Sequence, residues 1–400
     1  MPNKTILIFG AGKIGRSFIG QLFGLSGYNV VFSDVDLEIV NALNERKSYP
    51  VVIKGEKEET LLVPNVRAVS GLDQARVVRE VAQASVLAVS VGKNALEKVI
   101  PLIGEGLRLR YQLTPDRPLD IIIAENMRSA SEFILEKLSS CLPADYPLDQ
   151  LLGLVETSIG KMVPIMSQAD LERDPLMVFA EPYNSLIVDK KGFKGPIPEV
   201  KGLAPKENIK AWVDRKAFIH NLGHAAAAYC GAYKYPEATY VYEVLDDPEV
   251  FGFVREAMFQ SAKILQTLYP NDFSMEDLEA HMDDLLHRFR NKALKDTIFR
   301  VGQDRLRKLE SDDRFAGIIR LAISLGMNYD KILKAMAYAF YFQATDENGR
   351  KSDQDILFDK YRSKGIEFTL QKVCGFDPVK DKKLIAEFET YYNALDCRRV

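Results

Sequence analysis

The chain has few of the residues that metal sites, disulfide frameworks and membrane spans require. It contains four histidines and four cysteines among 400 residues. The cysteines lie far apart and form no Cys-x-x-Cys pair, which favours a reduced, cytoplasmic protein. No apolar run is long enough to cross a bilayer, and the apolar N-terminal run is too short for a secretory signal. We therefore expect no membrane association. We also expect no metal, because the histidines are few and His281 and His287 lack a metal-ligand spacing.

A large excess of charge of one sign is also missing. The 53 basic and 56 acidic side chains leave a net charge of −3 at neutral pH, and the basic residues are spread along the chain. The composition thus predicts no nucleic-acid partner. With 47% apolar and 27% charged residues, the chain resembles a globular protein, and its length favours two domains over one core.

The N-terminus carries the pattern of a dinucleotide-binding fold. A strand-length apolar run, Thr5–Phe9, leads into a Gly-x-Gly-x-x-Gly loop, and a helical pattern follows. The first glycine permits a tight turn, the second lets backbone approach a pyrophosphate, and the third lets the helix pack on the strand. Unpaired N–H groups at the helix N-terminus then face the phosphates. The predicted cofactor contacts in this loop are Gly10, Ala11, Gly12, Lys13, Ile14 and Gly15.

Asp34 follows a second apolar run, Val30–Phe32, and lies 24 residues after Gly10. An acid at this place bonds the ribose hydroxyls of NAD and repels the 2′-phosphate of NADP. Gly92 ends a further buried-type strand and joins the predicted cofactor site. The sequence therefore favours NAD as the cofactor; the alternative is a Gly-rich turn in some other α/β fold.

Strand and helix patterns alternate up to about residue 160, which predicts an α/β fold with a Rossmann-type, doubly wound parallel sheet. Ligands bind beyond the carboxyl ends of such strands, and Asn126 and Thr157 follow two more of the apolar runs. A connector rich in Gly and Pro covers residues 190–198, and the pattern is helical from about residue 205. We expect an NAD-binding domain over residues 1–195 and a mostly α-helical substrate-binding and catalytic domain over residues 196–400.

Three polar residues stand near the start of the helical part: Lys216, Asn221 and His224. A helix from about Ala211 to Tyr229 would place Asn221 about 140° and His224 about 80° around the axis from Lys216. Burial lowers the pKa of a lysine, and a general base works best with a pKa near the working pH. The three could form a proton-transfer face. Such residues on a helix are more often surface groups, so this pattern alone leaves the reaction open.

Lys-x4-Asn-x2-His after a Rossmann-type domain is accompanied by further characteristic segments. These are Phe9–Arg16, Ala124–Met127, Arg288–Asn291, Leu294–Asp296, Arg300–Gly302, Leu306–Leu309 and Asp313–Arg314. Together they resemble the polyol-specific long-chain dehydrogenase family, most closely its mannitol-1-phosphate 5-dehydrogenase branch. The resemblance runs over most of the chain.

The resemblance implies metal-independent hydride transfer between NAD and one carbinol carbon of an open-chain polyol. On the closest branch, the reaction interconverts mannitol 1-phosphate and fructose 6-phosphate, so the expected partner is a small sugar phosphate or polyol. Lys216 matches the general base of the family, and His224 matches the histidine that orients the substrate. Asn221 and Asn126 match the two carboxamides that hold the substrate oxygen, which is an oxyanion-hole arrangement. The family also implies a monomer or a weak homodimer.

A sugar phosphate needs several cationic donors, and arginine has the best geometry for this. The densest basic stretch of the second domain supplies Arg300, Arg307 and Lys308 as predicted substrate contacts. The alternative is a solvated helical face that pairs with the neighbouring acids.

Lys161 is a further candidate for a substrate contact. Many family members carry Val-Asp-Arg where this chain has Ile159, Gly160 and Lys161. Lysine keeps the positive charge but loses the bidentate fork. Lys161 could therefore pair with the substrate phosphate or with a neighbouring acid, and the departure bears on substrate identity more than on reaction type.

Two other functions stay open at this point. The same chemistry could act on another polyol or ketose, or on a uronate, without a phosphate. The chain could also be a catalytically silent NAD-binding regulator. The joint presence of Lys216, Asn221, His224 and Asn126 argues against the regulator, because NAD binding alone requires none of them.

Overall fold

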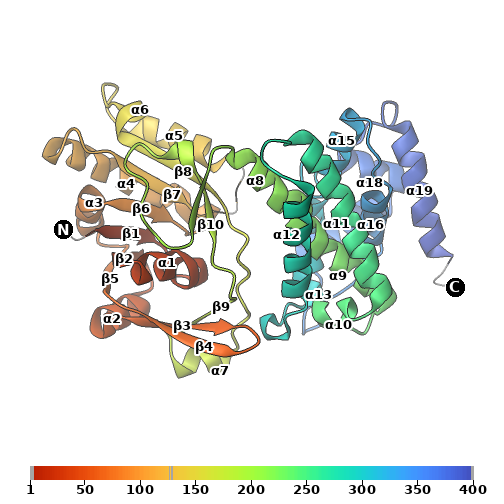
Figure 1. Cartoon of the computed structure of the whole chain (residues 1–400), viewed down its shortest axis with the longest axis horizontal. Helices are drawn as coiled ribbons and strands as arrows, with labels where there is room; N and C mark the ends of the chain where they lie inside the picture. Colours follow the sequence, from red (N-terminus) through yellow and green to blue (C-terminus); the bar gives the residue numbers. More distant parts are fainter. Residues whose placement is uncertain (1–3, 126, 128, 398–400) are drawn as a thin grey trace. The chain divides into compact units, whose positions relative to one another are not determined.

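The computed structural model describes residues 4–125, 127 and 129–397. The chain divides into two compact units, Met1–Ile209 and Lys210–Val400 (Figure 1). The first unit contains a mainly parallel sheet with helices, and the second is mostly helical, which confirms the predicted fold class. The division lies later in the chain than the expected 195/196, because one more strand, Leu203–Lys206, pairs within the first unit.

The main sheet of the first unit is built from strands β1 (Thr5–Phe9), β2 (Asn29–Asp34), β5 (Val66–Ser70), β6 (Val86–Val89), β7 (Leu119–Ile123), β8 (Leu152–Ser158), β10 (Leu186–Asp189) and β11 (Leu203–Lys206). Their order is β11-β10-β8-β7-β6-β1-β2-β5. Neighbours from β8 to β5 pair in parallel, whereas β10 runs antiparallel to β8. The carboxyl ends of β1, β2, β6 and β7 therefore meet at one edge of the sheet. Gly10 follows β1 there, Asp34 ends β2, and Gly92 comes shortly after β6.

Strand β1 is covered on both faces. Ile6 and Ile8 belong to one apolar cluster, and Leu7 and Phe9 belong to another. Helices on the first side are η1 (Gly15–Gly20, a π-helix), α1 (Gln21–Leu25) and α2 (Leu37–Arg46); those on the second are α3 (Gln74–Gln83), α4 (Lys93–Leu113) and α5 (Ala130–Cys141). Strands buried on both faces must be apolar throughout, which is why continuous apolar runs identified them in the sequence.

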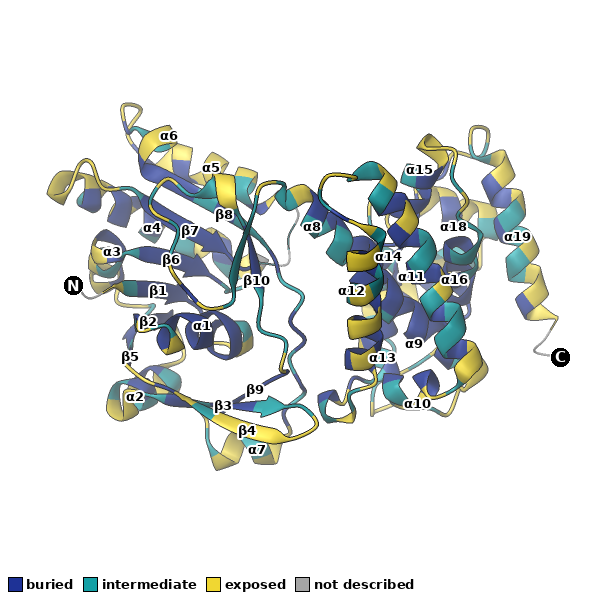
Figure 2. Cartoon of the chain, viewed as in Figure 1, coloured by how far each residue is buried: buried dark blue, intermediate teal, exposed yellow. Residues whose placement is uncertain are grey.

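A second, smaller sheet in this unit was not predicted. It has the order β4-β3-β9, from β3 (Tyr49–Lys54), β4 (Glu58–Val63) and β9 (Val178–Ala180). Figure 2 shows β4 largely exposed, in contrast to the buried strands of the main sheet. The first unit also contains the short helices α6 (Leu148–Leu151), α7 (Gln168–Arg173) and η2 (Lys190–Gly192).

The second unit packs around one buried helix. Its helices are α8 (Ile209–Arg215), η3 (Lys216–Asn221, a π-helix), α9 (Leu222–Lys234), α10 (Val241–Leu245), α11 (Pro248–Leu268), α12 (Met275–Phe289), η4 (Lys292–Leu294), α13 (Ile298–Gly302), α14 (Arg305–Lys308), α15 (Ala316–Ser324), α16 (Asp330–Phe340), α17 (Asp353–Arg362), α18 (Ile366–Lys372) and α19 (Lys382–Asp396). Helix α9 contacts α11, α13 and α16. The run Ala225–Ala228 is completely buried, because small side chains let neighbouring helices approach closely. Within the described part of the chain, no helix combines the length and apolarity of a membrane span.

Candidate active site

The glycine-rich loop has the geometry of a pyrophosphate cradle. Gly10 has a φ of +95°, which only glycine adopts without strain. A Cβ on Gly15 would lie 2.0 Å from the carbonyl oxygen of Gly10, so the close approach of helix and strand requires glycine there. A Cβ on Gly12 would meet no described atom within 4 Å, which leaves room for a ligand. The helix starts at Lys13, within the Gly-x-Gly-x-x-Gly motif, and includes Ile14.

Asp34 ends β2 and faces this loop. Its Oδ2 accepts a hydrogen bond from the Ala11 N–H over 2.6 Å, and its Oδ1 accepts one from the Asp36 N–H over 3.0 Å. The carboxylate is thereby held at the loop, where a ribose is expected. Loop, helix and carboxylate fit NAD, the predicted cofactor of this Rossmann-type domain.

Gly92 follows β6, the strand that pairs with β1 on the side away from β2. It is the N-cap of α4 and has a φ of +79°. The N–H groups of Val91 and Gly92 donate to the Glu125 carboxylate over 2.7 and 3.0 Å. Burial raises the pKa of Glu125, and these two hydrogen bonds oppose the rise. Glu125 is therefore a support of the cofactor turn that the sequence analysis did not identify, although it lies in the characteristic segment Ala124–Met127.

Lys216, Asn221 and His224 occupy one continuous helical stretch, as the sequence predicted, but its middle turn is a π-helix. Helices α8, η3 and α9 follow each other without a break, and η3 runs from Lys216 to Asn221. In a π-helix, hydrogen bonds join residues five apart. Asn221 therefore lies one turn from Lys216 on the same side of the helix, which corrects the angle of about 140° expected for a regular α-helix. Single π turns are frequent at functional sites.

The pKa of Lys216 is lowered to about 8. The main cause is burial, and the positive charges of Arg314 and Arg307 lower it further. Arg314 also braces the π turn, because its Nη1 donates to the backbone carbonyl of Asn221 over 3.3 Å. Asp313 holds Arg314 in place by accepting from its Nε over 2.8 Å. A lysine with this pKa can exchange a proton near neutral pH.

His224 lies against an aromatic ring and a carboxylate. The imidazole stacks on the Phe289 ring at 4.5 Å between centroids and 4° between planes. Its Nε2 lies 3.3 Å from Oδ2 of Asp296, a buried carboxylate that also forms an ion pair with Arg300. Burial, followed by nearby cations, lowers the pKa of His224 to about 3. The imidazole is therefore neutral at physiological pH. His220 is buried as well, and the centre of its ring lies 5.6 Å from the centre of the same Phe289 ring.

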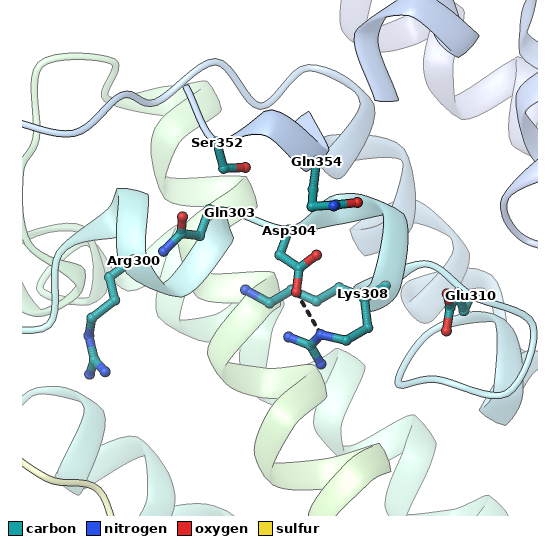
Figure 3. Close-up of a pocket in the computed structure, with 8 residues that line it drawn as sticks. Arg300, Gln303, Asp304, Lys308, Glu310, Ser352 and Gln354 are labelled. Carbon is teal, nitrogen blue, oxygen red and sulfur yellow. Dashed lines mark hydrogen bonds and ion pairs between the residues drawn. The ribbon is translucent and has the colours of Figure 1, made fainter. Parts of the chain in front are cut away.

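Three of the four basic residues predicted to contact the substrate, Arg300, Arg307 and Lys308, line one cavity of about 730 Å³ in the second unit. Arg300 lies at one end of the group and Glu310 at the other, with Gln303 and Asp304 between them (Figure 3). The complete lining is Arg300, Gln303, Asp304, Arg307, Lys308, Glu310, Ser352 and Gln354. Three cationic side chains thus face two carboxylates.

The contacts of the cations in this cavity differ. Arg307 donates from Nε to Oδ2 of Asp304 over 2.6 Å and remains about half exposed. Lys308 is buried and donates from Nζ to the carbonyl of Val301 over 2.6 Å. Burial and the charges of Arg314 and Arg307 lower the pKa of Lys308 to about 7. An anion in the cavity would stabilise the protonated form of this amine.

Arg305 belongs to the same basic stretch but does not line the cavity. It is completely buried, where it donates to Oδ1 of Asp355 over 2.7 Å and to Oδ1 of Asp359 over 3.0 Å. The guanidinium also packs over the Phe358 ring at 4.5 Å. Arg305 is therefore a structural residue that joins α14 to α17.

One further predicted residue, Lys161, has its contacts within the first unit. Lys161 lies in the first unit, buried, with its Nζ donating to Oδ1 of Asn184 over 2.9 Å and to Oε1 of Gln21 over 3.4 Å. Its ammonium also lies 5.0 Å from the centre of the Phe18 ring. A role of Lys161 in substrate binding stays a prediction, to which these intramolecular contacts add no support. Asn126 lies outside the described residues.

This combination of a Rossmann-type unit and a helical unit with a half-buried lysine of lowered pKa is that of a two-domain, nicotinamide-dependent dehydrogenase. Residues 4–202 match the family model described as the mannitol dehydrogenase Rossmann domain, and residues 208–396 match the mannitol dehydrogenase C-terminal domain. The chain therefore belongs to the mannitol dehydrogenase family, a family of polyol dehydrogenases.

Solved structures show the same fold. A substrate-free D-sorbitol dehydrogenase matches over 99% of this chain and 96% of its own, with a TM-score of 0.81 and 14% identity. A Pseudomonas fluorescens mannitol 2-dehydrogenase in a ternary complex with NAD and D-mannitol matches over 98% and 92%, with a TM-score of 0.74 and 15% identity. At these identities the likeness concerns the fold alone.

Proposed function

We propose that the protein is a metal-independent, NAD-dependent oxidoreductase that interconverts mannitol 1-phosphate and fructose 6-phosphate. The observation that carries the phosphate specificity is the gathering of Arg300, Arg307 and Lys308 around one cavity. The same unit holds Lys216, whose pKa of about 8 suits proton transfer.

The proposed chemistry assigns one task to each polar group. Bound NAD supplies the hydride acceptor for polyol oxidation, and NADH the donor for ketose reduction. Neutral Lys216 removes the proton from the carbinol hydroxyl during oxidation, and its ammonium returns a proton during reduction. Asn221 and Asn126 donate hydrogen bonds to the substrate oxygen as it gains negative charge. Neutral His224 orients the substrate by hydrogen bonding.

The phosphate is proposed to bind in the cavity lined by Arg300, Arg307 and Lys308. Arginine offers paired donors for phosphate oxygens, and lysine adds a point charge. Ser352, which is the N-cap of α17, and Gln354 in the first turn of that helix also line the cavity. Negative ligands are stabilised near a helix N-terminus, so the helix adds to the three cations.

The alternative is the same reaction on an unphosphorylated polyol, ketose or uronate. It is compatible with the family, and cavity carboxylates such as Asp304 could bond sugar hydroxyls. A silent NAD-binding regulator is disfavoured, because a half-buried lysine with a lowered pKa serves no purpose in cofactor binding.

A panel of initial rates tests this proposal. Polyols, ketoses, uronates and the phosphorylated sugars are each assayed with NAD or NADH in the presence of a chelator. We expect the highest kcat/KM with fructose 6-phosphate and mannitol 1-phosphate. Faster turnover of a sugar without phosphate would refute the phosphate specificity and leave the dehydrogenase assignment intact.

A further inference from the structure

Asp296 occupies a position between the two functional clusters of the second unit. The residue is only 4% exposed. On one side Oδ2 lies 3.3 Å from Nε2 of His224, and on the other Oδ1 pairs with Nη2 of Arg300. One buried carboxylate thus contacts both the proposed substrate-orienting histidine and a cation of the proposed phosphate cavity.

The backbone, and not the side chain, fixes the place of Asp296. Its carbonyl accepts the Val241 N–H over 2.9 Å, and the next residue, Thr297, forms a β-bridge with Tyr240. The side-chain oxygens of Asp296 and Nε2 of His224 have no aligned hydrogen bond within the described residues. Buried polar atoms without aligned partners are costly, so small changes around them can alter their pairing.

Packing restricts the imidazole of His224, so that mainly its ring nitrogens can respond to a change in the surroundings. Stacking on Phe289 fixes the plane of the ring. A carboxylate at Nε2 then decides which nitrogen carries the proton and which can accept a hydrogen bond. Since the low pKa of His224 keeps the ring neutral, Asp296 can act on it by orientation and tautomer rather than by adding charge.

We propose that Asp296 is a positioning residue that transmits occupancy of the Arg300 cavity to His224. This inference rests on the proposed phosphate function. Without an anion, Arg300 draws the carboxylate toward itself. A phosphate bound to Arg300 competes for the guanidinium, and Asp296 then aligns with Nε2 of His224. The phosphate thereby increases turnover as well as affinity.

The variant Asp296→Asn separates these effects in steady-state reduction of fructose 6-phosphate and fructose. We expect kcat for fructose 6-phosphate to fall about ten-fold or more while its KM changes less than about three-fold. The kcat for fructose should stay nearly unchanged. Asp296→Glu keeps the charge and should recover part of the lost turnover. An equal loss of kcat on both ketoses would overturn the proposed coupling.

A spectroscopic readout tests the coupling without turnover. In protein labelled with ¹⁵N-histidine, inorganic phosphate should shift the Nε2 resonance of His224 in the parent but not in Asp296→Asn. A parent resonance that does not respond to phosphate overturns the inference. Asp246→Asn is the matched control, because Asp246 pairs with Arg290 on an exposed surface of the same unit, and it should behave like the parent.

These results distinguish the inference from the proposed function. A parent enzyme that reduces fructose 6-phosphate no faster than fructose contradicts the proposed substrate. A parent that prefers fructose 6-phosphate, with a His224 resonance insensitive to phosphate, contradicts only the role of Asp296. Thermal melting of each variant shows whether the fold is retained.

Discussion

Arg314 donates a hydrogen bond from Nη1 to the backbone carbonyl of Asn221 over 3.3 Å. Burial lowers the pKa of Lys216 most, and among the nearby charges the same guanidinium has the largest effect. One side chain therefore holds the last residue of the π turn and adjusts the basicity of its first residue.

The pKa of Lys216 predicts opposite pH profiles for the two directions of the reaction. Oxidation needs the neutral amine, so its kcat/KM should fall as the pH drops below about 8. Reduction needs the ammonium and should slow as the pH rises above about 8. Initial rates in both directions, measured between pH 7 and 10, test both profiles. A sugar phosphate stays largely a dianion over this range.

Variants of Arg314 provide the control for that assignment. Arg314→Met removes a positive charge, which should raise the pKa of Lys216 and move both profiles to higher pH. Arg314→Lys keeps the charge and should leave the midpoints near those of the parent. Profiles that do not move with Arg314→Met would show that another group titrates.

Removal of the proposed base should abolish hydride transfer without affecting the cofactor. For Lys216→Ala we expect a loss of about 10²–10⁴-fold in kcat, the usual contribution of a general acid–base. The dissociation constant of NADH, measured by fluorescence titration, should barely change. Lys210→Ala, in α8 upstream of Lys216, is the matched control and should keep normal turnover. Normal turnover by Lys216→Ala would refute the assignment of Lys216 as the general base.

Asp34 should determine the choice of cofactor. Asp34→Asn keeps an oxygen that can accept the Ala11 N–H but removes the charge that repels a 2′-phosphate. We expect weaker NAD binding and a smaller preference for NAD over NADP, measured as the ratio of kcat/KM values. Asp36→Asn removes a nearby charge while asparagine still caps α2, and it should keep the preference. Equal use of NADP by the parent would contradict this role of Asp34.

Arg307 provides the cleanest test of the phosphate cavity, because its half-exposed side chain contributes little to the core. Arg307→Gln should raise KM for fructose 6-phosphate by about ten-fold, as expected for loss of a charge-assisted contact worth roughly 1.5 kcal/mol. KM for fructose should stay the same. Arg290→Gln, an exposed arginine away from the cavity, serves as the control. A uniform change for both ketoses would place the phosphate elsewhere.

The buried pair of Arg305 and Asp355 should affect stability and not specificity. The two side chains are 0% and 3% exposed. Asp355→Ala leaves the guanidinium without its main partner, which typically costs about 3–5 kcal/mol. Denaturant unfolding should show this loss, and a variant as stable as the parent would contradict the structural role.

Much of the fold could be predicted because buried parallel strands leave a strong pattern. β1, β2, β6, β7 and β8 each contain a continuous apolar run that polar or glycine residues follow. β4 was not predicted, because it is an exposed edge strand that starts with Glu58 and Glu59 and so lacks both an apolar run and a clear alternation.

The sequence indicates which elements carry the candidate site residues, but not the local geometry of those residues. The spacing from Lys216 to His224 indicates a shared helical face, but no spacing rule distinguishes a π turn from an α turn. Arg305 and Arg307 look alike in sequence. Their roles differ because the partners of Arg305 lie about 50 residues away on α17, and such long-range pairing cannot be read from a local pattern. Asp296 was part of a characteristic segment, yet its contacts with His224 and Arg300 appear only in three dimensions.

The most direct test of the central claim is isotopic. Fructose 6-phosphate is incubated with NADH that carries deuterium at the transferable position, with a chelator present, and the product is examined by NMR. The account predicts mannitol 1-phosphate with one deuterium on the carbinol carbon that was the ketone. The account would be contradicted if fructose 6-phosphate gave no deuterated polyol phosphate while an unphosphorylated ketose accepted the deuterium.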